Sequence, residues 1–184
     1  REQVAASYRN WMNSHPFDVG QATTAALGEP ITATESIADT ITRRAAMRNM
    51  SSKANGALMR ASALGIWATR VSASDAAKAA RDDASLTHPN SSCQRASAAY
   101  VVAIRHLLIN PGDAAGAFGQ AKGVLESPGA RTSDEVLIWL LEAEKGLLPA
   151  AYPSAGFVRI AFCHAFRHLL HETPYTQALR EVLA

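Results

Sequence analysis

Apolar positions recur every three or four residues along most of the chain, which is the spacing of one face of an α-helix. The clearest case is the stretch 91–109. The positions that build its apolar face are Ala99, Val102, Ala103 and His106, with Val101, Ile104 and Leu108 widening it. No segment alternates convincingly with a period of two, as a half-buried strand would. The pattern therefore predicts an all-α protein.

Capping residues and helix breakers divide this pattern into about eight to ten helices. The expected starts are an N-cap at Asp18, an N-cap at Asn55, and capping-box spacings at Thr32–Glu35 and Ser72–Asp75. The expected stops are Gly28 with Pro30, and Pro111 with Gly112. The predicted helices cover 2–13, 18–27, 35–48, 55–68, 75–86, 91–109, 113–126, 132–147 and 155–171, and a last one begins at Thr173-Pro174.

Composition supports a globular protein. The chain has 184 residues, of which 48% are apolar and 18% charged, so it can bury a core and is not disordered. Frequent alanine favours closely packed helices. We expect one all-α domain over residues 1–184. Cys93 and Cys163 have no partner at metal-ligand spacing, so we expect two free thiols packed in helices.

Charge and hydropathy exclude two classes of partner. The net charge of +2, without a basic stripe, argues against nucleic acid. The sequence contains no apolar run long enough to span a membrane and no visible leader. We therefore expect a cytoplasmic protein with no membrane partner.

The first candidate site is "SHPFDVGQATTAAL", residues 14–27. If Asp18 caps the helix, the amides of Val19, Gly20 and Gln21 are free at the positive end of the helix dipole, which attracts anions. Gly20 would let a phosphate approach the backbone. An ordinary capped helix, in which the glycine only eases the turn, explains the same residues.

The second candidate is "KANGALMRASALGIWA", residues 53–68, where an apolar helical run opens with Asn55-Gly56. Met59 would pack inward, and Arg60 would reach along the first turn toward a phosphate or a carboxylate. Two interpretations stay open. One is the wall of a ligand site, and the other is a capped, buried helix with Arg60 in a structural ion pair.

The third candidate is "ASLTHPNSSC", residues 84–93. His88 stands between the end of a helix and Pro89, in a loop, where polar functional groups concentrate. A lone histidine is, however, more often a C-terminal cap of the preceding helix than a ligand or a base.

Other clusters are weaker candidates for metal binding. Asp82 and Asp83 are neighbours, but adjacent helical side chains point about 100° apart and seldom share an ion. His164, His168 and His171 fall at i, i+4 and i+7 without a carboxylate at supporting spacing. We expect the histidines to lie on a partly buried or solvated helix face.

Taken in order, these stretches resemble the motifs of the ADP-ribosylglycohydrolase family. That family typically shows "PFD-x-G-x-T-x-x-A-L", then "NG-x-L-M-R", then "LTHP" with a following cysteine and "A-x-A-A-Y-V-x-A-I". Here they read "PFDVGQATTAAL", "NGALMRASALGI" and "SLTHPNSSCQRASAAYVVAI". The stretch "AGFVRIAFCHAFRHLLHETPYTQALREVLA" is similar to the family's "GYV" helix and "SFEEALR" ending. The resemblance spans nearly the whole chain and implies a compact fold of many roughly orthogonal helices.

The resemblance also implies a ligand site, because in the family the three loops line one cleft that holds ADP-ribose. By this resemblance, backbone amides of Gly20, Gln21 and Ala22 would face the diphosphate. The wall beside the phosphates and the distal sugar would be formed by Asn55, Gly56, Met59 and Arg60. His88 would lie near the same cleft, and Phe157, where the family often has tyrosine, would stack on the base or a ribose.

The metal chemistry of the family is where this sequence departs from it. The resemblance implies two Mg²⁺ ions held by acidic motifs of the "DDT" and "GGDTDT" kinds, and neither motif is present in the 184 residues. Asp82-Asp83 is followed by Ala84 and lies at the wrong place to substitute. We therefore expect no metal ligands here and a chain that is the central portion of a larger domain, with a missing segment or partner chain carrying the acidic motifs.

Three functions follow as hypotheses. The first is an ADP-ribosylglycohydrolase-like protein that hydrolyses the bond between ADP-ribose and a modified side chain when the acidic segments are present. The second is a non-catalytic ADP-ribose-binding or structural member of the family. The third is a helical interaction module without a ligand. The partner expected for the first two is ADP-ribose or an ADP-ribosylated protein, and whether the chain by itself is an enzyme stays open.

Overall fold

The computed structural model describes residues 1–32, 34–126 and 134–183. In these ranges the chain forms eleven α-helices and one short 3-10 helix, with no strand, which confirms the all-α prediction. The helices are α1 (Glu2–Asn13), α2 (Gln21–Leu27), α3 (Ile37–Arg48), α4 (Gly56–Arg60), α5 (Ser62–Trp67), η1 (Ala68–Arg70), α6 (Ala73–Ser85), α7 (Ser91–Ile109), α8 (Ala114–Glu126), α9 (Glu135–Glu144), α10 (Val158–Leu170) and α11 (Tyr175–Leu183). Residues 132 and 133 of the predicted helix 132–147 lie outside the described ranges.

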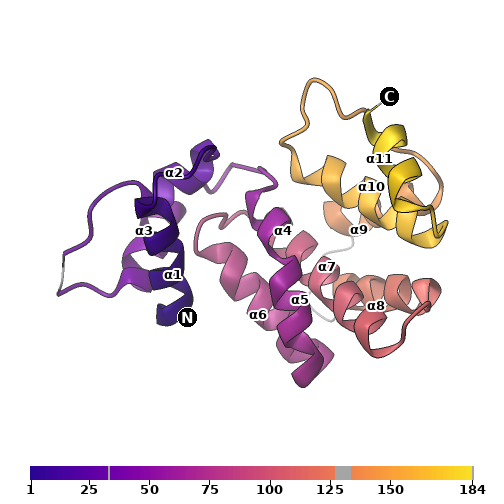
Figure 1. Cartoon of the computed structure of the whole chain (residues 1–184), viewed down its shortest axis with the longest axis horizontal. Helices are drawn as coiled ribbons and strands as arrows, with labels where there is room; N and C mark the ends of the chain where they lie inside the picture. The colour runs from indigo at the N-terminus through magenta and orange to yellow at the C-terminus, as the bar shows by residue number, and fades with distance from the viewer. Residues whose placement is uncertain (33, 127–133, 184) are drawn as a thin grey trace.

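The long helix α7 is the centre of the arrangement. Helices α4, α5, α6, α8, α9 and α10 all pack against it. Helices α1, α2 and α3 gather at one end of the molecule and α9, α10 and α11 at the other, as Figure 1 shows.

Two buried clusters involve α7, one rich in aromatic side chains and one built from small side chains, and a third apolar cluster joins α1, α2 and α3. Phe162 and Phe166 of α10 have ring centroids 4.6 Å apart, and Phe118 meets Phe166 edge-on at 6.1 Å. The α6–α7 contact is built from small residues, so the two helices lie close together. Its buried members include Ala76, Ala77, Ala80, Ala98, Val101 and Val102.

One predicted cap is confirmed and another is displaced. Ser72 accepts a hydrogen bond from the Asp75 amide at 3.1 Å, as its spacing predicted. Thr32 and Glu35 do bond to each other, at 2.8 Å, but helix α3 begins later, after Ser36, so the cap predicted at Thr32 is wrong. Ser36 follows the Thr32–Glu35 turn and itself accepts from the first turn of α3.

The predicted helix over 55–68 is interrupted. It forms α4, α5 and the 3-10 turn η1, with the break at Ala61, whose amide donates to Leu58 in a tight turn. The turn brings Gly65 against α7 so closely that a Cβ there would lie 2.5 Å from Cγ2 of Ile104. The glycine in "SALGIW" is thus required by the helix contact.

None of the helices in the described part of the chain has both the length and the apolar character needed to cross a lipid bilayer.

Candidate functional site

Two segments far apart in sequence pair directly. Ala54 and Phe157 form an isolated antiparallel bridge, in which the Val158 amide donates to Lys53 at 2.8 Å. Beside it, the Asn55 amide donates to the Gly156 carbonyl at 2.8 Å, and the Asn55 side chain reaches Ala155 at 3.3 Å. The loop before α10 is therefore fixed against the start of α4. Asn55 and Phe157, both predicted site residues, lie at this pairing of the two segments.

The beginning of α2 is tied to the turn that carries His88 by a buried side chain, Asn49. Its Nδ2 group donates to the carbonyl oxygens of Ala22 at 2.7 Å and Thr87 at 2.9 Å. Asn49 is only 4% exposed, and both amide hydrogens are used. The sequence analysis did not identify Asn49, and no local pattern marks it.

Gly56 and His88 are in direct contact, which explains the glycine after Asn55. A Cβ at Gly56 would lie 2.9 Å from Cε1 and 3.0 Å from Nε2 of His88, and 3.6 Å from Oγ1 of Thr23. The glycine is therefore required by close approach to the ring. The start of α2, the start of α4 and the turn after α6 meet at this point. We call this meeting point, marked by Gly56, His88 and Thr23, the junction.

Helix α2 begins later than predicted. Its N-cap is Gly20, with φ −62° and ψ 146°, and no side chain caps it, so the N-cap predicted at Asp18 is wrong. The amides without an intrahelical acceptor are consequently those of Gln21, Ala22 and Thr23. A Cβ at Gly20 would meet nothing within 4 Å, so packing does not require this glycine.

The structure answers the open question about Arg60. Its Nε donates to Asp83 Oδ2 at 3.1 Å, its Nη2 to the Asp83 carbonyl at 2.9 Å and its Nη1 to Thr87 Oγ1 at 2.7 Å. The guanidinium also lies 4.6 Å from the ring centroid of Tyr8. Arg60 is thus in a structural ion pair with Asp83, next to the turn that carries His88. Its neighbour Met59 is 71% exposed, so the prediction that Met59 packs inward is wrong.

His88 is a buried, neutral imidazole. The ring is 1% exposed, and Nδ1 lies 2.8 Å from the hydroxyl of Thr87. Burial, with a smaller contribution from the Arg60 charge, lowers the pKa of His88 to about 4. The backbone amide of His88 also bonds to Ala84 at the end of α6, so the residue does belong to the C-terminal turn of that helix.

Phe157 is the N-cap of α10 and is half-buried. Its ring packs edge-on against Trp139, with centroids 5.7 Å apart and an interplanar angle of 84°. The ring of Phe157 is therefore held on one side by the core residue Trp139.

The segment before α4 also makes contacts with side chains of α7 and α9. The Sγ of Cys93 lies 3.4 Å from the carbonyl oxygen of Ala54, and Lys53 forms an ion pair with Glu135 at 2.7 Å. Both cysteines are buried free thiols, as predicted. Burial raises the pKa of Cys93 and of Cys163 to about 11, so neither is a thiolate nucleophile at neutral pH.

The candidate metal groups are engaged elsewhere. Asp82 pairs with Lys78 at 2.6 Å, whereas Asp83 pairs with Arg60, so the two adjacent carboxylates point to different partners. Among the described residues, no group of three histidine, cysteine, aspartate or glutamate side chains could hold a metal ion. The residues present in these ranges do not fit the two-ion magnesium centre that the resemblance implies.

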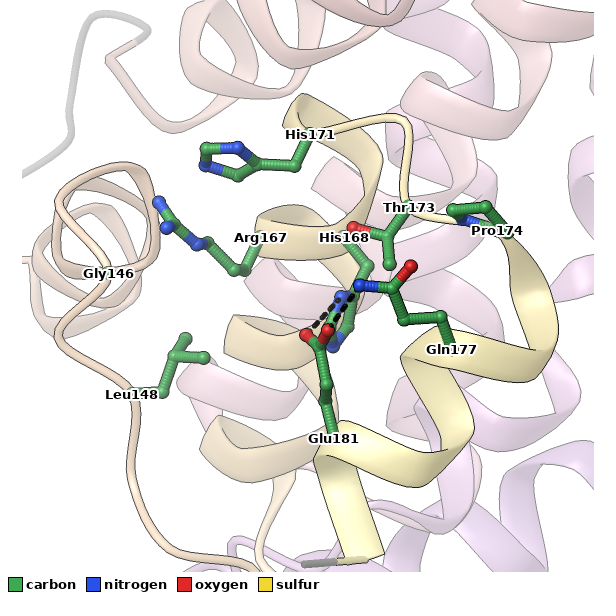
Figure 2. A pocket seen from close by; sticks show the side chains of 9 residues that line it. All are labelled: Gly146, Leu148, Arg167, His168, His171, Thr173, Pro174, Gln177 and Glu181. Carbon is green, nitrogen blue, oxygen red and sulfur yellow. Dashed lines mark hydrogen bonds and ion pairs between the residues drawn. The ribbon is translucent and has the colours of Figure 1, made fainter.

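A polar cavity lies away from this junction, at the C-terminal end. It measures about 450 Å³, and Figure 2 shows Arg167 and His168 of α10 on its wall, with His171 just after that helix and Glu181 of α11. His168 Nδ1 lies 3.7 Å from a Glu181 oxygen. The cavity contains none of the residues predicted to bind ligand.

Comparison with known proteins gives one family match. The family model described as ADP-ribosylglycohydrolase matches residues 1–184, the full length of the sequence. No curated protein and no solved structure matches the chain.

Proposed function

This chain belongs to the ADP-ribosylglycohydrolase family, and from that premise we propose that the junction around Gly56 and His88 forms the ADP-ribose-binding wall of a hydrolase. The reaction is cleavage of the glycosidic bond between ADP-ribose and a modified side chain. The proposed contacts come from one all-α domain. They are Gly20, Gln21, Ala22, Asn55, Gly56, Met59, His88 and Phe157, with Arg60 acting from beneath.

The convergence of four distant segments supports this proposal. Asn49 joins the start of α2 to the turn at Thr87, Gly56 lies against His88, and Asn55 bonds to Gly156. These are the segments in which the family motifs lie. An isolated motif can occur by chance, but packing of all of them at one junction is what a shared ligand would require.

The chemistry of the junction suits a nucleoside diphosphate sugar. The first-turn amides of α2 are donors at the positive end of a helix, which favours phosphate oxygens. The open space beside Gly20 leaves the backbone accessible. The neutral ring of His88 keeps hydrogen-bonding capacity, which suits a ribose or a phosphate oxygen. The exposed Met59 offers an apolar surface at the rim.

The role assigned to this chain is binding and orientation. Members of the family generally depend on metal ions, but the described residues do not provide a metal site. We therefore derive no catalytic step from these residues. They hold the diphosphate and the sugar so that the glycosidic carbon is presented at a fixed position.

Titration of the purified chain with ADP-ribose, with and without Mg²⁺, tests this proposal. We expect saturable one-site binding, and the Gly20→Val variant should bind more weakly because the new side chain fills the space before α2. Gly119→Val is the matched control, because a Cβ at Gly119 also meets nothing within 4 Å and lies on α8. Binding that is unaffected by Gly20→Val would contradict the phosphate position.

A hydrolysis assay on an ADP-ribosylated peptide separates the two family-level functions. Release of ADP-ribose supports the hydrolase, whereas binding without release identifies a non-catalytic ADP-ribose-binding member. Absence of any ADP-ribose binding would contradict both.

A further inference from the structure

A continuous chain of side-chain contacts runs from α1 to His88, beneath the proposed wall. Tyr8 donates to Asp83 Oδ1 at 2.6 Å, and Asp83 Oδ2 accepts from Arg60 Nε at 3.1 Å. Arg60 Nη1 donates to Thr87 Oγ1 at 2.7 Å, and Thr87 Oγ1 lies 2.8 Å from His88 Nδ1. The members come from α1, α4, α6 and the turn after α6, so the chain of contacts depends on the tertiary fold.

The hydrogens of this chain can be assigned from donor and acceptor chemistry. A guanidinium only donates, so Arg60 must give its hydrogen to Thr87 Oγ1. Thr87 is 0% exposed, and within the described residues the acceptor left for its own hydroxyl hydrogen is His88 Nδ1. Nδ1 is then an acceptor, and a neutral ring with an acceptor at Nδ1 carries its hydrogen on Nε2.

The charges around the ring keep this assignment fixed at neutral pH. Arg60 is the cation on the Thr87 side of His88, and it is itself paired with Asp83. Burial raises the pKa of Tyr8 to about 12, so Tyr8 remains a donor to Asp83. The low pKa of His88 means that no second hydrogen binds to Nδ1 near pH 7.

The Nε2 side of the ring faces the junction. Nε2 lies 3.0 Å from the position that a Cβ of Gly56 would take, with Oγ1 of Thr23 near the same point. Within the described residues, no protein acceptor is bonded to Nε2. The ring therefore presents one N–H group where α2 and α4 begin.

We propose that Thr87 is a positioning residue that holds His88 as the Nε2–H tautomer, so that the ring donates a hydrogen bond to an oxygen of the ligand. Arg60 acts through Thr87 and does not touch the ligand. For ADP-ribose, which is the ligand only if the proposed function holds, the acceptor is a phosphate or sugar oxygen. The site thereby selects an acceptor atom at this position and disfavours a ligand that places a donor there.

The tautomer is measured first, without ligand. The full chain is labelled with ¹⁵N-histidine, and the His88 ring signals are assigned among the six histidines by their loss in His88→Gln. We expect the Nε2–H pattern at pH 7 in the wild type and in Thr87→Ser, which keeps the hydroxyl. Thr87→Val, which matches threonine in shape but has no hydroxyl, should give a mixture with the Nδ1–H form.

Three results would overturn the tautomer assignment: an Nδ1–H ring in the wild type, a mixture in the wild type, or an unchanged ring in Thr87→Val. The wild-type spectrum decides the matter even if Thr87→Val does not fold.

ADP-ribose titration then tests the ligand contact. We expect Thr87→Val to bind about tenfold more weakly, the worth of one well-placed hydrogen bond, and Thr87→Ser to restore affinity. A Thr87→Val variant with an altered tautomer but full affinity would overturn the contact. If the wild type binds no ADP-ribose, the proposed function fails, while the ring spectra still decide the role of Thr87.

Discussion

The side-chain amide of Asn49 donates a 2.9 Å hydrogen bond to the carbonyl oxygen of Thr87, across 38 residues of sequence. Its other hydrogen goes to Ala22, so a single buried side chain sets the spacing between α2 and the turn that carries His88. The relative position of these two elements therefore depends on this amide together with the apolar cluster that contains Leu27 of α2 and Leu86 of the turn. This makes Asn49 the first residue to test.

Replacing Asn49 with alanine should destabilise the protein by about 3 kcal/mol, because it leaves two buried carbonyl oxygens without donors. We expect ADP-ribose affinity to fall as well, since α2 is no longer held near His88. Urea unfolding and ligand titration measure the two effects. Asn110→Ala is the control, because within the described residues the side chain of Asn110 makes only a long 3.4 Å bond at an exposed helix end. Equal stability of the two variants would contradict the role of Asn49.

Gly56→Ala should destabilise the fold by about 1–3 kcal/mol, the usual cost of inserting a methyl group into a filled space. The new Cβ would lie 2.9 Å from the ring of His88, which is buried and cannot move freely. Thermal unfolding provides the measurement. The same substitution at Gly119, where the space is open, should be neutral or stabilising, because alanine favours the helix. An unaffected Gly56→Ala variant would contradict the close contact of Gly56 with His88, above all if Gly119→Ala were the destabilised variant.

The two adjacent aspartates offer a comparison between a buried and an exposed ion pair. Arg60→Met should cost about 3–5 kcal/mol, because Asp83 is left largely buried without its partner. Lys78→Met removes the partner of Asp82, but that pair is 71% and 52% exposed, so we expect a change below about 0.5 kcal/mol. Chemical denaturation of both variants decides the ranking. In a double-mutant cycle, Arg60→Met should destabilise the Asp83→Asn protein less than it destabilises the wild type. An equal loss of unfolding free energy in both backgrounds would show that the ion pair is not the cause.

Stability should fall as the pH is lowered toward 4, in part because of His88. The folded pKa of about 4 lies below the ordinary value of 6.5, so between these values the unfolded chain binds a proton that the folded chain does not. The loss is about 1.4 kcal/mol per pH unit at most, and it is absent above pH 6.5. His88→Gln should show a shallower decline over this window in urea unfolding.

The positions of most helices could be predicted because their signals are local. The three-to-four-residue spacing and Pro111-Gly112 marked the extent of α7, and Ser72 with Asp75 marked the start of α6. The failures are also instructive. Asp18 and Thr32 have good capping chemistry, but the two helices begin further along the chain, where Gly20 and Ser36 take the N-cap positions. Residue type predicted a helix start in both regions, but it did not fix the exact N-cap residue.

The candidate site could be predicted only in part. Gly56 and His88 belong to recognisable motifs, and their contact follows the expectation that the motif loops meet. Asn49 and the bonds of Arg60 could not be foreseen, because their partners lie 23 to 38 residues away and nothing in their neighbours indicates the direction of the side chain. An arginine beside a glycine-containing loop suits phosphate binding and a structural ion pair equally well, and only the position of α6 distinguishes them.

The bridge between Ala54 and Phe157 has a consequence for biosynthesis. The two residues are separated by about a hundred positions, so closing this junction requires a long loop to be ordered first, a slow kind of contact to form. A ribosome must also release Phe157 from its exit tunnel before Asn55 can find its backbone partner. Helices α1 to α8 will emerge and begin to pack while the segment around Ala54 is still unpaired, so the ligand site proposed above is among the last parts of the newly made protein to be completed.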